Sequence, residues 1–207
     1  MICSTSFYFN KLSECETLMI YIDENPQDIN MTEALSAVSQ QRRDYALRYR
    51  REQDRRQCLS AYMLLQKALR QEYGIVEPPI FSFTPKGKPL LRDYPDIHFS
   101  LSHCQRATIC AISGQPVGID IESIDAYDPT IVSVTMSGKE QDAIAKAPSP
   151  AVAFIRLWTK KESLMKFLGE GLMIKQLPSI LEKDIPHHFV THENLTLGYI
   201  YTMCEGE

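Results

Sequence analysis

The sequence predicts an α+β fold in which a helix precedes antiparallel strands in each half of the chain. Apolar residues that recur every three or four positions over 58–69 predict the helix of the first half. Apolar residues that alternate with polar ones in 97–101 and again in 117–122 predict strands. Ser149 and Pro150, followed by a new apolar stripe, predict the start of the helix of the second half.

The composition limits the class of protein. The 207 residues suffice for one large domain or two small ones. With 44% hydrophobic and 23% charged residues the chain is typical of globular proteins, which excludes a disordered or fibrous one. No apolar run approaches the roughly 20 residues of a membrane helix, and residues 1–16 lack the pattern of a signal peptide. We therefore expect a cytoplasmic protein with no membrane partner, whose six cysteines, without a CxxC pair, are reduced.

Residues 41–73 are predicted to be helical, in one or two pieces, and Gly74 stands where a helix ends. The first part of this segment, residues 42–56, contains seven arginines and only three acidic residues. Such a run could bind nucleic acid, but acids interrupt it and no aromatic pattern accompanies it. We expect instead a solvated helix face that attracts an acidic partner protein, and no nucleic acid as a partner.

Strands and turns alternate after this helix. The extended segments are 80–83, 97–101 and 107–112, and the turns are 85–89 and 113–116. We place the boundary between the two halves in the second turn. It divides the chain into an N-terminal subdomain, residues 1–115, and a C-terminal subdomain, residues 116–207.

The strand over 117–122 carries two carboxylates on one face. Successive side chains of a strand point to opposite sides, so Asp120 and Glu122 share a face with Gly118, whose missing side chain leaves open space. Such a pair can bind a hard cation through oxygen. The alternative is a solvent-facing strand edge, since most charged side chains on strands are solvated. The strand alone favours neither interpretation decisively.

The remaining elements belong to the second half. Ser137 and Glu140 fit a capping box at the start of a helix that runs through Ala147. The helix after Pro150 has apolar core candidates and ends at Gly169 and Gly171; the candidates are Phe154, Ile155, Trp158 and Met165. Farther on, residues 195–203 alternate most clearly and are predicted to be a strand.

One face of this helix combines an aromatic side chain with two charges. Trp158, Glu162 and Lys166 lie four residues apart and therefore project from the same side. The simpler interpretation is a surface ion pair worth roughly 0.3–0.5 kcal/mol. However, Trp158 and the adjacent Met165 indicate partial burial, where a carboxylate and an ammonium need partners such as a metal ion and a phosphate.

Ser102 and His103 end the strand FSLSH, and both side chains can donate hydrogen bonds to a phosphate. No Ser-His-Asp order or nucleophile elbow indicates a hydrolase triad. The histidines at 187, 188 and 192 lie in a poorly patterned region and are interpreted as part of a polar loop or strand rather than as metal ligands.

Together and in this order, the motifs resemble those of 4′-phosphopantetheinyl transferases: FSLSH at 99–103, GIDIE at 118–122, WTKKESLMK at 158–166 and GEGL at 169–172. The spacing, the length and the Gly87-Lys88-Pro89 turn resemble the two-domain, surfactin-type branch, over roughly residues 40–175. The resemblance implies two similar α/β subdomains related by pseudo-twofold symmetry, each a helix packed on a small antiparallel sheet. Where relatives often have a phenylalanine, the stretch before Glu140 reads TMSGK, so we give Glu140 no catalytic role.

The resemblance implies a reaction and residues for it. Phosphopantetheine would pass from coenzyme A to a serine of an apo acyl or peptidyl carrier protein, with release of adenosine 3′,5′-bisphosphate. Breaking the diphosphate calls for a divalent cation, and Asp120, Glu122 and Glu162 would bind Mg²⁺ or Mn²⁺. Lys166 would neutralise the diphosphate, and Glu162 would help to remove the proton of the serine.

The resemblance also assigns residues to the rest of coenzyme A. Arg56, Ser102 and His103 match positions that contact the 3′-phosphate, and Lys88 matches a position beside the adenine. We expect a monomer. Two other functions stay open: a catalytically inactive protein of the same fold that binds carrier proteins or coenzyme A, and a metal-dependent nucleotide hydrolase. The intact acids argue against the first, and the lack of a motif that positions water argues against the second.

Overall fold

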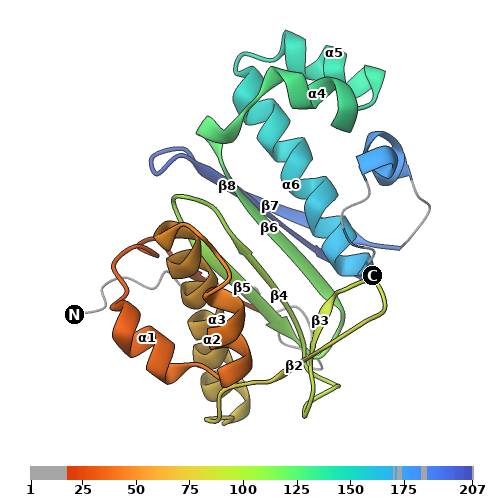
Figure 1. Cartoon of the computed structure of the whole chain (residues 1–207). Helices are drawn as coiled ribbons and strands as arrows, with labels where there is room; N and C mark the ends of the chain where they lie inside the picture. The colour runs from red at the N-terminus through yellow and green to blue at the C-terminus, as the bar shows by residue number, and fades with distance from the viewer. Residues whose placement is uncertain (1–17, 170, 172–173, 183–185, 207) are drawn as a thin grey trace.

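The computed structural model describes residues 18–169, 171, 174–182 and 186–206, so Cys3, Cys15, Glu170 and Leu172 lie outside the described residues. Figure 1 shows two halves, each with helices on the outer side of its strands. The elements are β1 (Met19–Asp23), α1 (Met31–Ala37), α2 (Gln40–Ala46), α3 (Glu52–Tyr73), β2 (Phe81–Phe83), β3 (Pro89–Leu91), β4 (His98–His103), β5 (Thr108–Ser113), β6 (Val117–Ser123), η1 (Ile124–Ala126), α4 (Pro129–Thr135), α5 (Gly138–Lys146), α6 (Pro150–Leu168), η2 (Ile174–Glu182), β7 (His188–Asn194) and β8 (Tyr199–Glu205).

The two halves have the same topology, as predicted. In the first, β1 precedes α3, β4 and β5 follow, and the antiparallel sheet has the order β1-β5-β4. In the second, β6 precedes α6, β7 and β8 follow, and the order is β6-β8-β7. In both halves the last strand is central and the long helix packs on the sheet. The repeated arrangement agrees with the pseudo-twofold symmetry that the resemblance implies.

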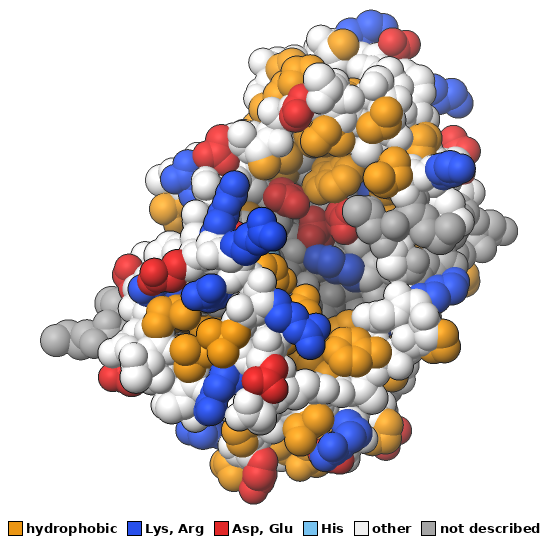
Figure 2. Space-filling view, viewed as in Figure 1, with side chains coloured by type: hydrophobic (Ala, Val, Ile, Leu, Met, Phe, Trp, Pro, Cys, Tyr) orange, Lys and Arg blue, Asp and Glu red, His pale blue; other side chains and the backbone are white. Residues whose placement is uncertain are grey.

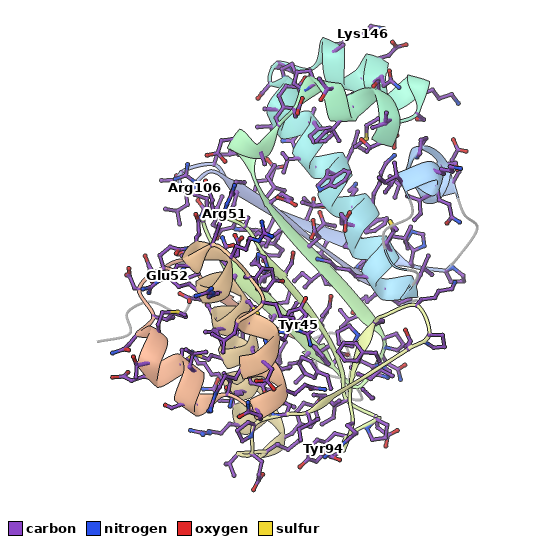
Figure 3. All side chains as sticks on the ribbon, in the orientation of Figure 1. Tyr45, Arg51, Glu52, Tyr94, Arg106 and Lys146 are labelled. Atoms are coloured by element: carbon purple, nitrogen blue, oxygen red, sulfur yellow. The ribbon has the colours of Figure 1, made fainter. Side chains whose placement is uncertain are left out.

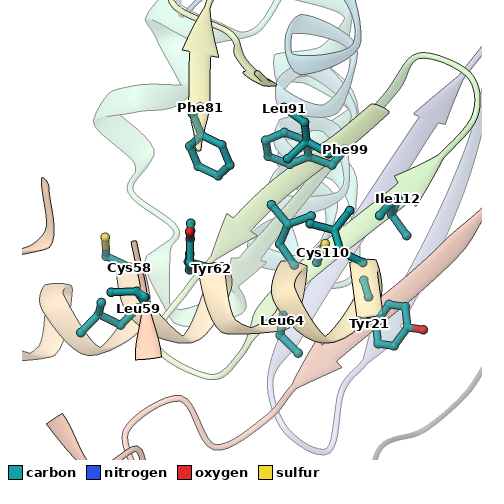
Figure 4. Close-up of a cluster of buried hydrophobic side chains, with 14 of the residues drawn as sticks. Tyr21, Cys58, Leu59, Tyr62, Leu64, Phe81, Leu91, Phe99, Cys110 and Ile112 are labelled. Atoms are coloured by element: carbon teal, nitrogen blue, oxygen red, sulfur yellow. The ribbon is translucent and has the colours of Figure 1, made fainter. Parts of the chain in front are cut away.

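The first core lies between α3 and its sheet. Its buried side chains include Leu59, Tyr62 and Phe99; Figure 4 shows Leu59 and Tyr62 on the helix and Phe99 on the strand side of the cluster. The ring of Phe81, from the β2–β3 hairpin, stacks on Phe99 with ring centroids 5.2 Å apart. Packing on α3 and β4 therefore holds the base of this hairpin, although among the described strands β2 and β3 pair only with each other.

The two sheets meet along β4 and β6, which run side by side in Figure 1. They are not paired by a backbone ladder. Instead, the Ser100 hydroxyl of β4 accepts a hydrogen bond of 3.0 Å from the backbone N–H of Ile119 on β6. Apolar side chains of both sheets, among them Ile109 and Ile121, form one shared cluster. This junction brings the polar end of β4 next to the acidic face of β6.

Local sequence signals fix the boundaries of the helices in the second half. Ser137 and Glu140 form the predicted capping box of α5. The Ser149 hydroxyl accepts from the N–H of Val152 at the start of α6, and Gly169 ends that helix with a φ of 68°. Of the core candidates, Phe154, Ile155 and Met165 are buried and Trp158 is half-buried.

One strand prediction is wrong. Residues 195–203 do not form a single strand, because Leu195–Gly198 is a turn between β7 and β8. Gly198 adopts a φ of 75°, which reverses the chain. The alternation of Leu195 and Leu197 continues that of β8 by chance, and both side chains are exposed.

The structure also bears on the cysteines and on membrane insertion. The four described cysteines, Cys58, Cys104, Cys110 and Cys204, are buried and form no disulfide.

In the described part of the chain, none of the helices has both the length and the apolar character to cross a bilayer.

Candidate active site

Strand β6 lies directly against helix α6. A Cβ atom added to Gly118 would stand 2.0 Å from the carbonyl oxygen of Ser163 and 2.4 Å from the amide nitrogen of Phe167. The expectation that Gly118 leaves open space beside the acids is therefore wrong, because the helix backbone fills that space. The close contact turns the Asp120 face of β6 toward the Glu162 face of α6.

Asp120 is the most buried acid of the site, with 3% of its surface exposed. Its Oδ1 accepts hydrogen bonds from the Ser102 hydroxyl at 2.8 Å and from the Lys166 ammonium at 2.7 Å. Its Oδ2 is also buried and receives no hydrogen bond from any described residue. A buried carboxylate oxygen without a donor is costly. Thus Oδ1 of Asp120 has two hydrogen-bond donors, whereas Oδ2 has none among the described residues.

Glu122 and Glu162 flank Asp120 from the strand and from the helix. The indole N–H of Trp158 lies 3.4 Å from Glu122 Oε1. Burial and then the charge of Asp120 raise the pKa of Glu122 to about 8 and that of Glu162 to about 7, although Lys166 lowers both. One ammonium therefore does not balance the three carboxylates, and the site has a deficit of positive charge.

The three acids do not form a ready coordination shell. Within the ranges described above, no three His, Cys, Asp or Glu side chains are close enough together to hold a metal ion. Like charges repel at short range, and the Lys166 ammonium occupies one oxygen of Asp120. The carboxylates still perturb one another electrostatically, and the unpartnered Oδ2 of Asp120 points to the same need for a cation. The residues present therefore fit a divalent cation by chemistry and charge.

A cavity of about 500 Å³ has His103 in its wall, the residue that follows Ser102, whose hydroxyl donates to Asp120. Partial withdrawal from water, and then the charges of Lys166 and Arg42, lower the pKa of His103, although the residue is exposed by its surface area. The wall combines aromatic and cationic side chains with the β2–β3 turn. Its lining residues are Gln41, Arg42, Tyr45, Arg48, Tyr49, Cys58, Ala61, Phe81, Phe83, Gly87, Pro89, Leu101 and His103; Figure 3 labels Tyr45 among them.

Arg42 is the best-placed cation of this wall. It donates to the carbonyl oxygen of Cys58 at 2.6 Å and lies over the rings of Tyr45 and Tyr62. Its Nε is buried and donates to no described residue. From the sequence, Arg42 is recognisable only as one of the arginines of a predicted helix. Whether an arginine points into a cavity depends on how α2 packs against α3, which helical spacing does not reveal.

Arg56 and Lys88 have other contacts. The guanidinium of Arg56 donates to the carbonyl oxygens of Gln27 and Ile29 and pairs with Glu52 at 2.6 Å, and it does not line the cavity. The ammonium of Lys88 donates to the carbonyl oxygen of Phe167 at 3.0 Å. Both assignments to coenzyme A stay predictions.

Lys161 is a buried cation that sequence analysis missed. Its fully buried ammonium donates to Glu140 at 2.6 Å and to the carbonyl oxygens of Thr135 and Leu177. These hydrogen bonds connect α4, α5 and η2 to α6. Glu140 is thus the ion-pair partner of Lys161. The signal was present: Lys161 is three residues after Trp158 and four before Met165, on the core stripe of the helix.

Figure 2 shows where the charges gather. Acidic side chains lie in a hollow between the two halves, lysines and arginines lie around it on the N-terminal half, and hydrophobic side chains lie above it on the C-terminal half. The site therefore offers carboxylates at its base and cations at one rim, which suits a ligand that carries phosphates together with a bound cation.

Comparisons with known proteins identify the family. A model of the 4′-phosphopantetheinyl transferase superfamily matches residues 116–201, and a model of the N-terminal part of 4′-phosphopantetheinyl transferases matches residues 24–115. The 4′-phosphopantetheinyl transferase Sfp of Bacillus subtilis (strain 168) is 32% identical over 158 residues, which are 75% of this chain and 70% of the relative. The transferase gsp of Aneurinibacillus migulanus is 37% identical over 142 residues, 67% of this chain and 59% of the relative. The chain therefore belongs to the 4′-phosphopantetheinyl transferases, in their two-domain, surfactin-type branch, and is an enzyme of that family.

Proposed function

We propose that the enzyme transfers 4′-phosphopantetheine from coenzyme A to a serine of an apo acyl or peptidyl carrier protein. The serine oxygen bonds to the phosphorus of phosphopantetheine, the bond from that phosphorus to the bridging oxygen of the diphosphate breaks, and adenosine 3′,5′-bisphosphate leaves. The observation that carries the proposal is the environment of Asp120. One of its oxygens is held by Ser102 and Lys166, and the other is buried without a donor among the described residues.

The acids support a requirement for a divalent cation. Asp120, Glu122 and Glu162 would bind Mg²⁺, or Mn²⁺, since carboxylate oxygens suit both ions. When bound, the cation neutralises charge on the diphosphate as the bridging bond breaks. The raised pKa values of Glu122 and Glu162 support this assignment, because they reflect first the burial of both carboxyl groups and then the negative charge of Asp120, both of which a bound cation would offset.

The protein side chains have complementary tasks. Lys166, anchored on Asp120, presents its ammonium toward the diphosphate and stabilises the leaving oxygen. Glu162 accepts the proton of the attacking serine, directly or through water. Ser102 holds Asp120 in place from the other subdomain. We therefore propose Asp120, Glu162 and Lys166 as the catalytic group.

The cavity beside His103 is our proposed site for the adenosine 3′-phosphate portion of coenzyme A. His103 and Arg42 supply donors for a phosphate, and Tyr45 supplies an aromatic surface for a base. Arg56, Ser102 and Lys88 remain assigned to coenzyme A by resemblance alone. The two family-model matches meet between residues 115 and 116, which supports the proposed division into two subdomains. A monomeric state in the cytoplasm stays a prediction.

A mass measurement tests the proposal. The protein is incubated with coenzyme A, Mg²⁺ and an apo carrier protein, and the carrier is weighed by mass spectrometry. A gain of one phosphopantetheine supports the transfer. Binding of coenzyme A or of the carrier with no gain would support an inactive binding protein. Release of adenosine bisphosphate with an unmodified carrier would support a hydrolase.

A further inference from the structure

Lys88 connects the two subdomains at a point that belongs to neither core. It lies in the turn between β2 and β3, and its ammonium donates at 3.0 Å to the carbonyl oxygen of Phe167, in the last turn of α6. The final carbonyls of a helix have no partner within the helix and carry negative partial charge. The N–H of Gly169 donates to the carbonyl oxygens of Met165 and Lys166, and Lys88 donates to the next one, that of Phe167.

Two glycines let the hairpin turn approach this closely. A Cβ on Gly169 would stand 3.0 Å from the Cδ of Lys88, and a Cβ on Gly171 would stand 3.2 Å from the carbonyl oxygen of Lys86. Both glycines also have positive φ angles, 68° and 56°. Because Gly169 and Gly171 lack a Cβ atom, they leave space at the end of α6 that the β2–β3 turn occupies. Burial lowers the pKa of Lys88, which agrees with an ammonium withdrawn from water.

The same turn is a wall of the cavity. Gly87 and Pro89, on either side of Lys88, and Phe83 line it, whereas Lys88 does not. The base of the hairpin is anchored to α2 by two hydrogen bonds between the Gln41 side chain and the backbone of Phe81. Beyond that base, β2 and β3 pair with each other and with no other strand that the structure describes. The position of this wall thus depends on how the turn is held at its far end.

We infer that Lys88 is a positioning residue that fixes the β2–β3 turn against the end of α6 and so holds the cavity wall in place before any ligand binds. The inference rests on the proposed function in one respect, that coenzyme A occupies the cavity. It differs from the resemblance, which places Lys88 beside the adenine. A positioning role acts on the ligand-free protein, whereas an adenine contact exists only with coenzyme A bound.

Hydrogen–deuterium exchange without coenzyme A separates the two roles. Lys88→Met keeps most of the stem and removes the donor, and Lys139→Met, an exposed site on α5, is the matched control. A hydrogen bond from a charged donor stabilises enough that its loss should speed exchange about tenfold in peptides that cover residues 84–91 and 164–169. Lys88→Arg, which keeps a cationic donor, should restore most of the protection. The control should match the parent protein.

Steady-state transfer adds a second readout. Loosening the wall should raise the KM for coenzyme A at least fivefold and leave the maximal rate within about twofold, since Lys166 keeps its own anchor on Asp120. Unchanged exchange in ligand-free Lys88→Met overturns the inference, even if the KM rises. Faster exchange across the whole chain with a lower melting temperature also overturns it. If the parent protein modifies no carrier, the proposed function fails, but the exchange experiment still decides the role of Lys88.

Discussion

At the scale of single residues, the proposed chemistry rests on an imbalance of charge around Asp120. Three carboxylates meet one ammonium, and Asp120 Oδ2 has no donor among the residues described. A folded protein tolerates such an arrangement where function compensates for it. The same imbalance gives the residue-scale predictions a common basis, since each changes one charge and leaves the packing intact.

Asp120→Asn should impair the response to Mg²⁺. The amide keeps the shape of the side chain but removes one charge from the cation site, so half-maximal transfer should need at least tenfold more Mg²⁺. Because the acids act as a unit, combining Asp120→Asn with Glu162→Gln should reduce the rate by much less than the product of the two single losses. A magnesium titration of the transfer rate is the measurement. Normal turnover of Asp120→Asn at low Mg²⁺ would show that Asp120 is not a metal ligand.

Lys166→Ala should lower the maximal rate of transfer by roughly 10²–10³-fold, because in the proposed reaction the ammonium stabilises charge that grows in the transition state. Glu162→Gln keeps size and hydrogen bonding and should also lower the rate. Both variants should remain folded, since neither removes core volume, but Lys166→Ala should melt at a lower temperature than the parent because it leaves the buried Asp120 carboxylate without its cation. A rate loss below about threefold for Lys166→Ala, with an unchanged melt, contradicts the role of a diphosphate ligand.

The free energy of unfolding of the metal-free protein should decrease as the pH rises from about 6.5 to 8. In the folded state the pKa of Glu122 is about 8 and that of Glu162 about 7, against an ordinary pKa of 4.5 for both side chains. In this window the folded protein binds more protons than the unfolded chain, so the free energy of unfolding falls with pH, by at most about 1.4 kcal/mol per unit and group. His103, with a lowered pKa, has the opposite effect, but mainly below its ordinary value of 6.5.

Thermal melts in a chelator at pH 6.5, 7.2 and 8 measure this slope. Glu122→Gln should flatten it, and so should saturating Mg²⁺, because the cation replaces the proton. A chelated parent protein whose melting temperature is constant over this range would disprove the charge imbalance.

At the scale of elements, the site depends on the contact between β6 and α6, and Gly118 makes that contact possible. Gly118→Ala would place a methyl group 2.0 Å from the Ser163 carbonyl oxygen, which belongs to rigid helix backbone. We expect a loss of about 3 kcal/mol in the free energy of unfolding, together with loss of activity. Gly138→Ala is the control, because nothing lies within 4 Å of its added Cβ and alanine favours a helix. Urea unfolding of both variants measures the difference, and equal stabilities would refute the close contact.

The sequence predicts those elements whose signals are local. The capping box at Ser137, the Ser149 cap and the alternation in β6 depend on neighbouring residues, and each lies where predicted. Strand β1 was not predicted, because its five residues carry no strong local pattern. They form a strand by pairing with β5, which is far along the chain. The contact of Gly118 with α6 and the inward direction of Arg42 likewise arise from packing between elements. The acids of the site could be predicted because one strand and one helix face carry them.

At the scale of the whole molecule, the distribution of arginines runs against the net charge of −4. Of the seven arginines between residues 42 and 56, four donate to backbone carbonyl oxygens: Arg42, Arg43, Arg55 and Arg56. These four arginines stabilise the N-terminal half through hydrogen bonds within the protein. The sequence does not distinguish them from the exposed arginines of the same segment. Arg48, Arg50 and Arg51 are exposed, and Arg48 also lines the cavity. The proposed attraction of an acidic carrier protein would therefore depend on Arg50 and Arg51, which are exposed and do not line the cavity.

The double change Arg50→Ala and Arg51→Ala should weaken the encounter with an acidic carrier protein and leave the chemistry intact. Two exposed charges are worth a few tenths to 1 kcal/mol each, so the KM for the carrier should rise about two- to tenfold at low salt, with the maximal rate near that of the parent. At 1 M salt, where the Debye length is about 3 Å, the parent and the variant should converge. Lys146→Ala is the control; Figure 3 labels Lys146 on α5 of the C-terminal half and Arg51 at the start of α3. If carrier binding is independent of salt, or if the lysine variant behaves like the arginine variant, these arginines do not steer the partner.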